Sequence, residues 1–223
     1  TGIAGSVATL TGPAIFPLNT DVAFEHDPLA ALIGSISQLQ ESGEGAAIQI
    51  VVSKDIDHSN SLYTNIIESA QKDGTRVKDL YDDATESIAR GVGKGLMAFF
   101  EKASSDEGKE KTIDTRNIEL ATAKNKSQTL TAGIRIIAAA ASLPRATTIL
   151  SAMKASFQQF SLPNSNSIGW NDVKASAIPA LVHDFTFRTM HTSQQLPLNI
   201  DELATIFHFP VGITSAPELK ESS

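Results

Sequence analysis

The chain has 223 residues, 41% of them hydrophobic, which is enough for one sizeable core or two small ones without disulfide or metal staples. It contains no cysteine, which excludes disulfides, thiolate zinc sites and cysteine nucleophiles and makes the cytosol the default compartment. The formal net charge of −7 at pH 7 disfavours a surface that wraps nucleic-acid phosphates and leaves only a local basic patch open.

The first predicted elements are an edge strand at residues 3–10 and a helix that starts at Asp27. Residues 14–16 are left open as a second short strand. Asp27 is a good N-cap and Pro28 suits the first helical position, while Gly43 and Gly45 end the helix. Its apolar residues fall on one face: Leu29, Leu32, Ile33, Ile36 and Leu39. Residues 46–53 then read as a strand.

The long interval at residues 61–128 is helical in pattern, with no convincing strand. One apolar stripe ends near Gly74, and a longer one continues through Val77 and Leu80 to Phe99 and Phe100. The charged stretch 104–111, with its glycine, is typical of a turn between helices. We therefore expect a hairpin of two helices that projects from a sheet.

A second strand and helix follow in the reverse order. Residues 130–141 form a mostly apolar strand with Gly133 as its weak point, and Ser142 and Pro144 open a helix with one apolar stripe. The longest apolar run, 134–143, is about half of the roughly 20 residues that a membrane span needs. The order helix, strand, interval, strand, helix, with one more strand at each end, predicts a split βαβ unit with a large insertion.

The C-terminal third is predicted as a loop at 161–167, a half-buried strand at 183–189, a linker at 194–198 and a last helix. The strand rests on the alternation of Phe185 and Phe187. Asn199 is the predicted cap of the last helix, and its acidic first turn suits the helix dipole.

These elements predict an α+β protein: a ferredoxin-like split βαβ sheet unit with a long helical-hairpin insertion and a C-terminal helix. We expect the sheet unit in residues 1–58 and 129–195, and the insertion in 59–128. Residues 196–223 are expected to form the C-terminal helix and a linker. Because the sequence starts at Thr1 without a methionine or a signal-like segment, we expect it to be part of a longer protein.

Residues 90–95 (RGVGKG) invite comparison with a phosphate-binding loop, but the spacing is wrong. Such a loop needs a glycine five positions before its Gly-Lys pair and a serine or threonine after the lysine, where this chain has Ile88 and Gly95. The segment also lies in a helical pattern and not after a strand. We therefore favour flexible or close-packing helix glycines.

Histidines and carboxylates give weak signals. Three His-Asp neighbours occur at positions 26–27, 57–58 and 183–184, and adjacent side chains point apart, so capping and surface roles are favoured over a relay. A metal cluster of His183, His191, His208 and Glu202 is considered, but the spacings match no helical ligand pair. The acidic group Asp79, Asp82, Asp83 and Glu86 is read as an exposed helix face.

A scattered basic set is the one candidate for contact with DNA. Few aromatic residues for base stacking interleave with it. Its members are Arg116, Lys124, Lys126, Arg135, Arg145 and Lys154. Residue chemistry alone shows no catalytic site, no metal site and no cofactor site, so the chain is predicted not to be an enzyme.

Three segments together resemble the region before the motor domain in TraG-like conjugative coupling proteins and related bacterial type IV secretion ATPases. The first is 27–29 (DPL), a helix and 43–50 (GEGAAIQI). The second is 133–139 (GIRIIAA) with Ala146, Ile149, Leu150 and 156–160 (SFQQF). The third and most specific is 198–210 (LNIDELATIFHFP). The resemblance covers about a third of the chain and leaves out the insertion and residues 1–19.

The resemblance implies a non-catalytic N-terminal accessory domain of a DNA- or protein-translocating ATPase, which mediates assembly or partner docking. It implies the ATPase domain of the same parent protein, further copies of the chain and secretion-channel proteins as partners. The location it implies is cytoplasmic, at the inner face of the membrane. Direct DNA contact stays open, no membrane span is predicted in the chain, and no nucleotide-binding residue or role for Arg135 carries over.

An interdomain contact is predicted at the end of the last helix, because a short apolar helix has little core of its own. Its residues are Leu203, Ile206, Phe207, Phe209 and Pro210. The alternative is that they pack back on the sheet of the same domain. Two other functions stay open: a free-standing scaffold that self-associates through the insertion, and a hydrolase with an unrecognised polar pocket.

Overall fold

The computed structural model describes residues 1–20, 27–36, 39, 43–54, 59–89 and 114–208. Its centre is a five-stranded antiparallel sheet, in which β2, β3, β1 and β4 are neighbours in that order and β5 pairs with the first part of β3. The strands are β1 (Gly2–Leu10), β2 (Gly45–Lys54), β3 (Thr129–Ala140), β4 (Ile168–Asp172) and β5 (Leu196–Asn199).

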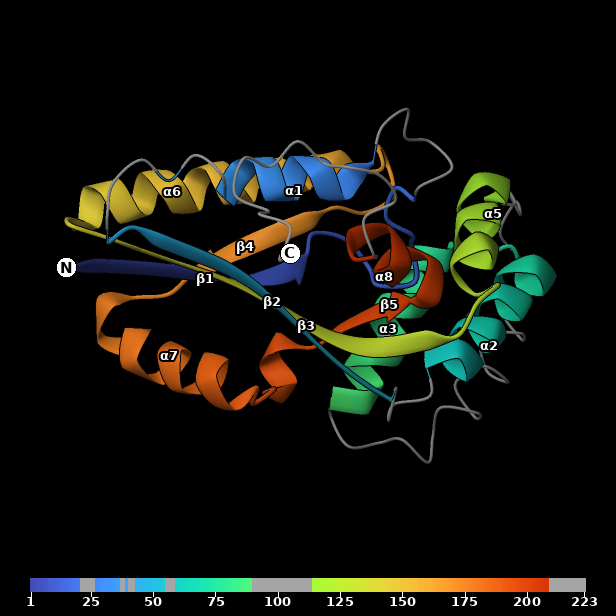
Figure 1. The fold of residues 1–223 in the computed structure, drawn as a ribbon. Helices are drawn as coiled ribbons and strands as arrows, with labels where there is room; N and C mark the ends of the chain where they lie inside the picture. Colours follow the sequence, from blue (N-terminus) through green and yellow to red (C-terminus); the bar gives the residue numbers. More distant parts are fainter. Residues whose placement is uncertain (21–26, 37–38, 40–42, 55–58, 90–113, 209–223) are drawn as a thin grey trace.

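Two helices cover one face of the sheet and one helix covers the other (Figure 1). α1 (Pro28–Ile36) and α6 (Leu143–Ser156) lie on the first face, and α7 (Ile178–Phe187) lies on the second. The cap of this helix is predicted near Ser142 or Leu143; Ser142 caps α6, and the predicted proline sits in its first turn. Ile134 and Ile136 of β3 are fully buried beneath this layer, with Phe157 and Phe160 of the 3₁₀ turn that follows α6. Apolar burial of this kind is the main force that holds the layers together.

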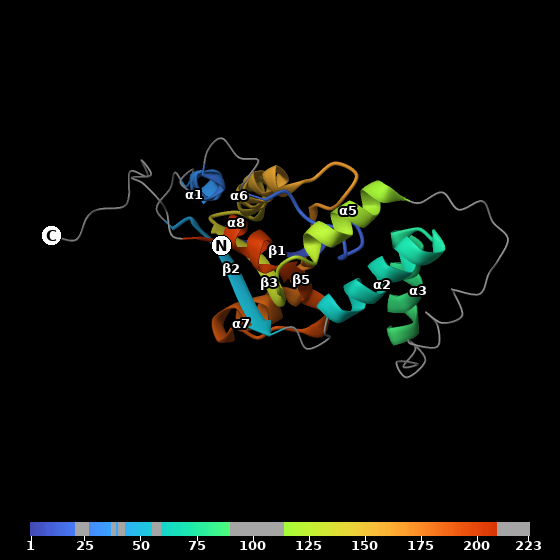
Figure 2. The ribbon, with the colours of Figure 1, turned by 90° about the vertical axis from the view of Figure 1, so that its right-hand side faces the viewer.

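Three further helices pack together at one end of the sheet, between β2 and β3 in the sequence. They are α2 (Ser59–Asp73), α3 (Val77–Ala89) and α5 (Thr115–Lys124), seen from their own end in Figure 2. Tyr63, Ile66 and Leu80 form the centre of a second apolar cluster, which Ile15 and Phe16 join from the N-terminal segment. The outer part of the predicted stripe, including Phe99 and Phe100, lies outside the described residues.

The predicted α+β class is confirmed. The finer assignment to the ferredoxin-like type stays a prediction, for which the element order β1, α1, β2, then β3, α6, β4 and the strand order are the supporting features. Two N-terminal predictions are wrong. β1 is not an edge strand, since it lies between β3 and β4. Residues 14–16 form no strand, because Ile15 and Phe16 turn into the helical cluster.

The predicted strand at 183–189 is wrong, because these residues lie in and just after α7. Leu181 and Asp184, three positions apart, are the buried residues of this helix, whereas Phe187 is 68% exposed. The alternation of two phenylalanines over a few residues was therefore a misleading signal of period two. Gly5 of β1 allows this packing, since a Cβ there would lie 2.2 Å from the Leu181 side chain.

Two strands of the sheet, β4 and β5, come from segments in which the sequence predicted no strand. β4 contains Trp170 but also Gly169, Asn171 and Asp172, which are poor strand formers, so its five residues gave no signal. The predicted linker at 194–198 is likewise mostly β5. The predicted cap of the last helix is confirmed: Asn199 caps α8 (Ile200–Ile206) in a capping box with Glu202.

Candidate functional site

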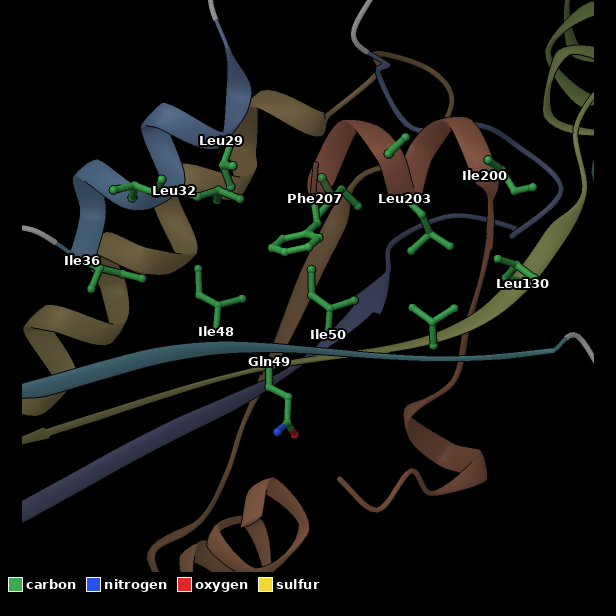
Figure 3. Close-up of a pocket in the computed structure, with 14 residues that line it drawn as sticks. Leu29, Leu32, Ile36, Ile48, Gln49, Ile50, Leu130, Ile200, Leu203 and Phe207 are labelled. Carbon is green, nitrogen blue, oxygen red and sulfur yellow. The ribbon is translucent and has the colours of Figure 1, made fainter. Parts of the chain in front are cut away.

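Residues of α1, β2 and α8 line an apolar groove of about 820 Å³ (Figure 3). Leu29, Leu32 and Ile36 of α1 lie on one side, and Ile48 and Ile50 of β2 point up from the floor. Ile200, Leu203 and Phe207 form the opposite side. The groove lies above the edge of the sheet between α1 and α8, which also contact each other.

The edge position of β2 explains why the groove is open. Among the described residues β2 pairs with β3 alone, and nearly all of its residues are half-exposed or exposed. Alternate residues of a strand point to opposite faces, so Ile48, Ile50 and Val52 share the groove side. Gln49 points to the other side, where its amide nitrogen donates to the Phe185 carbonyl at 2.8 Å (Figure 3).

The lining of the groove determines what it can do chemically. Within the described residues it includes no charged side chain, and its only polar one, Gln49, points away from it. The groove thus offers no acid, base or nucleophile, but its volume falls within the roughly 300–1,000 Å³ that ligand sites occupy. Its chemistry suits the burial of apolar groups from another molecule.

The residues predicted for an interdomain contact divide between the core and the groove. Ile206 is 1% exposed and belongs to the sheet core, and Leu203 packs against that core while lining the groove. Phe207 is 61% exposed at the groove wall. Phe209 and Pro210 lie outside the described residues, so the contact itself stays a prediction.

On the other side of α8, a fully buried ion pair joins this helix to the helical insertion. Lys124, the last residue of α5, donates to the Glu202 carboxylate, and both side chains are 0% exposed. Glu202 also accepts the backbone N–H groups of Leu18 and Asn199, at 2.8 and 2.9 Å. Asn199 in turn donates to the Lys124 carbonyl at 2.9 Å. We call these four residues the polar hub.

Electrostatics support a structural role for the polar hub. Burial lowers the pKa of Lys124, because desolvation penalises the ammonium, and the nearby Glu202 carboxylate opposes that shift. The carboxylate is occupied by three donors, so it has no obvious role toward a substrate. The sequence gave only the capping motif as a signal, since 78 positions separate Lys124 from Glu202.

A second polar cluster lies beneath α7. Arg135 of β3 is 1% exposed and donates to the Thr189 carbonyl, while its Nη1 has no partner among the described residues. Burial lowers the pKa of Arg135, and the charge of Asp184 opposes this. The Nε2 atom of His191 lies 2.9 Å from Asp184 Oδ2. These contacts fasten α7 and the segment after it to the sheet.

The histidines considered as metal ligands do not gather. His183 and His191 both lie beside Asp184, whereas His208 lies 3.0 Å from Asp27 and Glu202 belongs to the polar hub. Within the ranges that the structure describes, no group of three or more histidine and carboxylate side chains is placed to hold a metal ion. His26 and His58 fall outside those ranges.

The acidic and basic candidates are distributed as follows. Asp82, Asp83 and Glu86 lie on the exposed side of α3, and Asp79 pairs with Arg76 one turn away. Four of the six basic residues have intramolecular partners, which are Glu202 for Lys124, Thr189 for Arg135, Glu44 for Arg145 and Asp172 for Lys154. Arg116 and Lys126 are the exposed members. The phosphate-loop candidate, residues 90–95, lies outside the described residues.

Comparisons with protein-family models, curated proteins and solved structures gave no match. The resemblance to TraG-like proteins is therefore untested by them and stays a prediction. Within the described part of the chain, no helix combines the length and the apolar character that crossing a membrane requires.

Proposed function

We propose that this chain is a non-catalytic assembly domain, which binds an apolar surface of a neighbouring protein in the groove between α1, β2 and α8. The observation that carries the proposal is the groove itself: about 820 Å³ of space with an apolar lining, which no described residue fills, beside a strand that is an edge among the described residues. A monomeric protein rarely leaves a large apolar surface uncovered unless another molecule binds there.

We further propose that the domain works beside the motor of a type IV secretion or conjugative DNA-transfer ATPase, at the inner face of a bacterial membrane. This part rests on the resemblance of segments 27–50, 133–160 and 198–210 to that family. The third segment contains α8 and Phe207, which line the groove. In such an assembly the neighbouring protein would be another copy of the chain, the ATPase domain or a channel component.

The polar clusters favour this proposal over hydrolysis. Glu202 already accepts three structural hydrogen bonds, and the contacts of Arg135, Asp184 and His191 hold α7 against the sheet. A hydrolase needs a polar pocket in which a nucleophile and a base meet. The groove has the opposite chemistry.

Site-specific photo-cross-linking in cells tests the proposal. A photoreactive phenylalanine analogue at position 207 should give a discrete adduct, and mass spectrometry should identify its partner as a second copy, an ATPase domain or a channel protein. The matched control is position 187, which is exposed to a similar degree on α7. The proposal fails if position 207 gives no adduct, if both positions give the same adducts, or if the purified chain itself hydrolyses nucleotides.

A further inference from the structure

The two edges of the sheet differ in a way that bears on which partner docks at the groove. The far edge, β4, has five residues, and its Asp172 is held by Ser6 and Lys154. The near edge, β2, has ten residues, and from Gly45 to Ser53 it contains neither a charge nor a proline. Natural edge strands are usually short, charged or interrupted, because an unprotected edge pairs with another strand.

We propose that β2 is the contact through which a second copy of this chain docks, by antiparallel pairing of the two β2 strands. This inference rests on the proposed function, because it names the partner for the groove side of the sheet. The backbone N–H and C=O groups along the outer edge of β2 would form the new ladder, and the two sheets would become continuous.

The residue pattern of β2 restricts the register of this pairing, and we propose the one in which Ile48 lies opposite Ile50 of the second copy. Opposite residues in an antiparallel pair point to the same face, and a slip of one residue would set the groove side of one copy against the α7 side of the other. When Ile48 faces Ile50 of the second copy, Ala46 faces Val52 and Gln49 faces itself. Isoleucine and valine in such cross-strand pairs are favourable, and all of these except Gln49 lie on the groove side.

The same register also decides what lies at the ends of β2. Lys54, at the end of the strand, then lies opposite Glu44, which immediately precedes it. The Glu44 side chain is 1% exposed and already accepts from Arg145 with both carboxylate oxygens, so the apolar pairs along the strand, and not a new ion pair at its ends, carry the contact. The grooves of the two copies meet across the joint, where each shields the apolar floor of the other from water.

Self-association of the full chain tests the inference, with Val52→Lys as the disruptive variant. Val52 is 47% exposed, so the substitution leaves the core intact but places an ammonium in the proposed joint. Sedimentation should show a dimer in the parent chain, with a dissociation constant at least about tenfold weaker in V52K. Phe187→Lys, an exposed apolar residue on α7, is the matched control and should leave the dimer unchanged.

Cysteine cross-linking tests the register, and the absence of native cysteines makes the result direct. A mixture of Ala46→Cys and Val52→Cys chains should form a disulfide dimer under mild oxidation, while either variant alone should form far less. The inference is overturned if the parent chain is a monomer, if V52K and F187K behave alike, or if the mixture does not cross-link. A V52C thiol that a maleimide cannot reach in a monomer would show that the chain covers its own edge, which also overturns it.

These outcomes separate the inference from the proposed function. If the chain is a monomer but position 207 cross-links to an identified motor or channel protein, the β2 pairing is wrong and the docking role stands. If the β2 dimer forms but position 207 gives no adduct, the groove is not the docking surface and the proposed function fails.

Discussion

The two sides of α8 are built in opposite ways. On the inner side, Glu202 and Asn199 make a fully buried set of hydrogen bonds to Lys124 and Leu18. On the outer side, Leu203 and Phe207 line an apolar groove that no described residue fills. A seven-residue helix therefore takes part both in a fully buried polar cluster and in the wall of an apolar groove.

We infer that the two sides of α8 have different roles. Polar bonds between α8, α5 and the N-terminal segment fix the orientation of α8, because a buried hydrogen-bonded pair tolerates only one geometry. Once the helix is fixed, its apolar outer residues are presented at a defined distance from β2. In this account the hub positions the wall of the groove and the groove binds the partner.

Removal of the hub lysine should have the largest effect on stability. Lys124→Met keeps the length of the side chain but leaves the Glu202 carboxylate buried without its cation, which should cost about 4 kcal/mol of unfolding free energy. Urea denaturation followed by circular dichroism measures this loss. Lys126→Met is the matched control, since Lys126 is exposed, and should change stability by less than about 0.5 kcal/mol. Equal stabilities of the two variants would contradict the structural role of the hub.

Two adjacent residues of the α8 region should respond in opposite ways to truncation. Ile206→Ala should destabilise the fold by about 3 kcal/mol, because Ile206 is 1% exposed in the sheet core. Phe207→Ala should leave stability within about 0.5 kcal/mol and weaken partner binding instead. Thermal unfolding and the cross-linking yield at a neighbouring groove position distinguish the two. A large stability loss in F207A would place its side chain in the core and weaken the docking account.

Loss of the helix cap should have an intermediate effect. Asn199→Ala removes the side chain that accepts from the Glu202 N–H and donates to the Lys124 carbonyl, and should cost about 1–2 kcal/mol. Asn199→Ser keeps a capping acceptor but loses the amide donor, so it should recover part of the stability. If N199A and N199S are equally destabilised, the cap itself contributes little.

The smallest expected effect is a pH dependence at the far edge of the sheet. Hydrogen bonds from Lys154 and Ser6 lower the pKa of Asp172 in the folded chain. In the unfolded chain the pKa has the ordinary aspartate value of about 3.9, so near and below that pH the unfolded chain binds more protons at this site than the folded chain. The stabilisation by this carboxylate is therefore present above that value and is lost as the pH falls through the folded pKa.

Comparison of the parent chain with Asp172→Asn in acid measures this contribution. Because the Asp172 side chain is 67% exposed, the difference in unfolding free energy should be only a few tenths of a kcal/mol at neutral pH. It should shrink further as the pH is lowered below about 4. A difference that grows in acid would have the wrong sign for a lowered pKa.

Helices with a clear capping sequence at their start could be predicted from the sequence. Ser142 and Pro144 marked the start of α6, and Asn199 with Glu202 marked the start of α8, because caps depend on residues within one helical turn. α7 was misread because two phenylalanines two positions apart imitate a strand. β4 was missed because its pairing with β1, and not its own composition, makes it a strand.

The candidate site could be predicted only in part. Leu203 and Phe207 were expected at a contact, but the floor of the groove comes from β2 and its far wall from α1. The width of the gap between α1 and α8 depends on how each packs against the sheet, which no local pattern records. The Lys124–Glu202 pair was equally invisible, since a lysine at the end of one helix and a glutamate in another are ordinary surface residues in sequence.

Hydrogen exchange at two protein concentrations is the most direct test of the central claim that the β2 side of the sheet is a docking surface for a second copy of the chain. Amides of β2 and of α8 should become more protected as the concentration rises, while those of β4, at the opposite edge, should exchange at the same rate in both samples. Equal exchange of β2 at both concentrations, or a rise in protection that is confined to β4, would contradict the account.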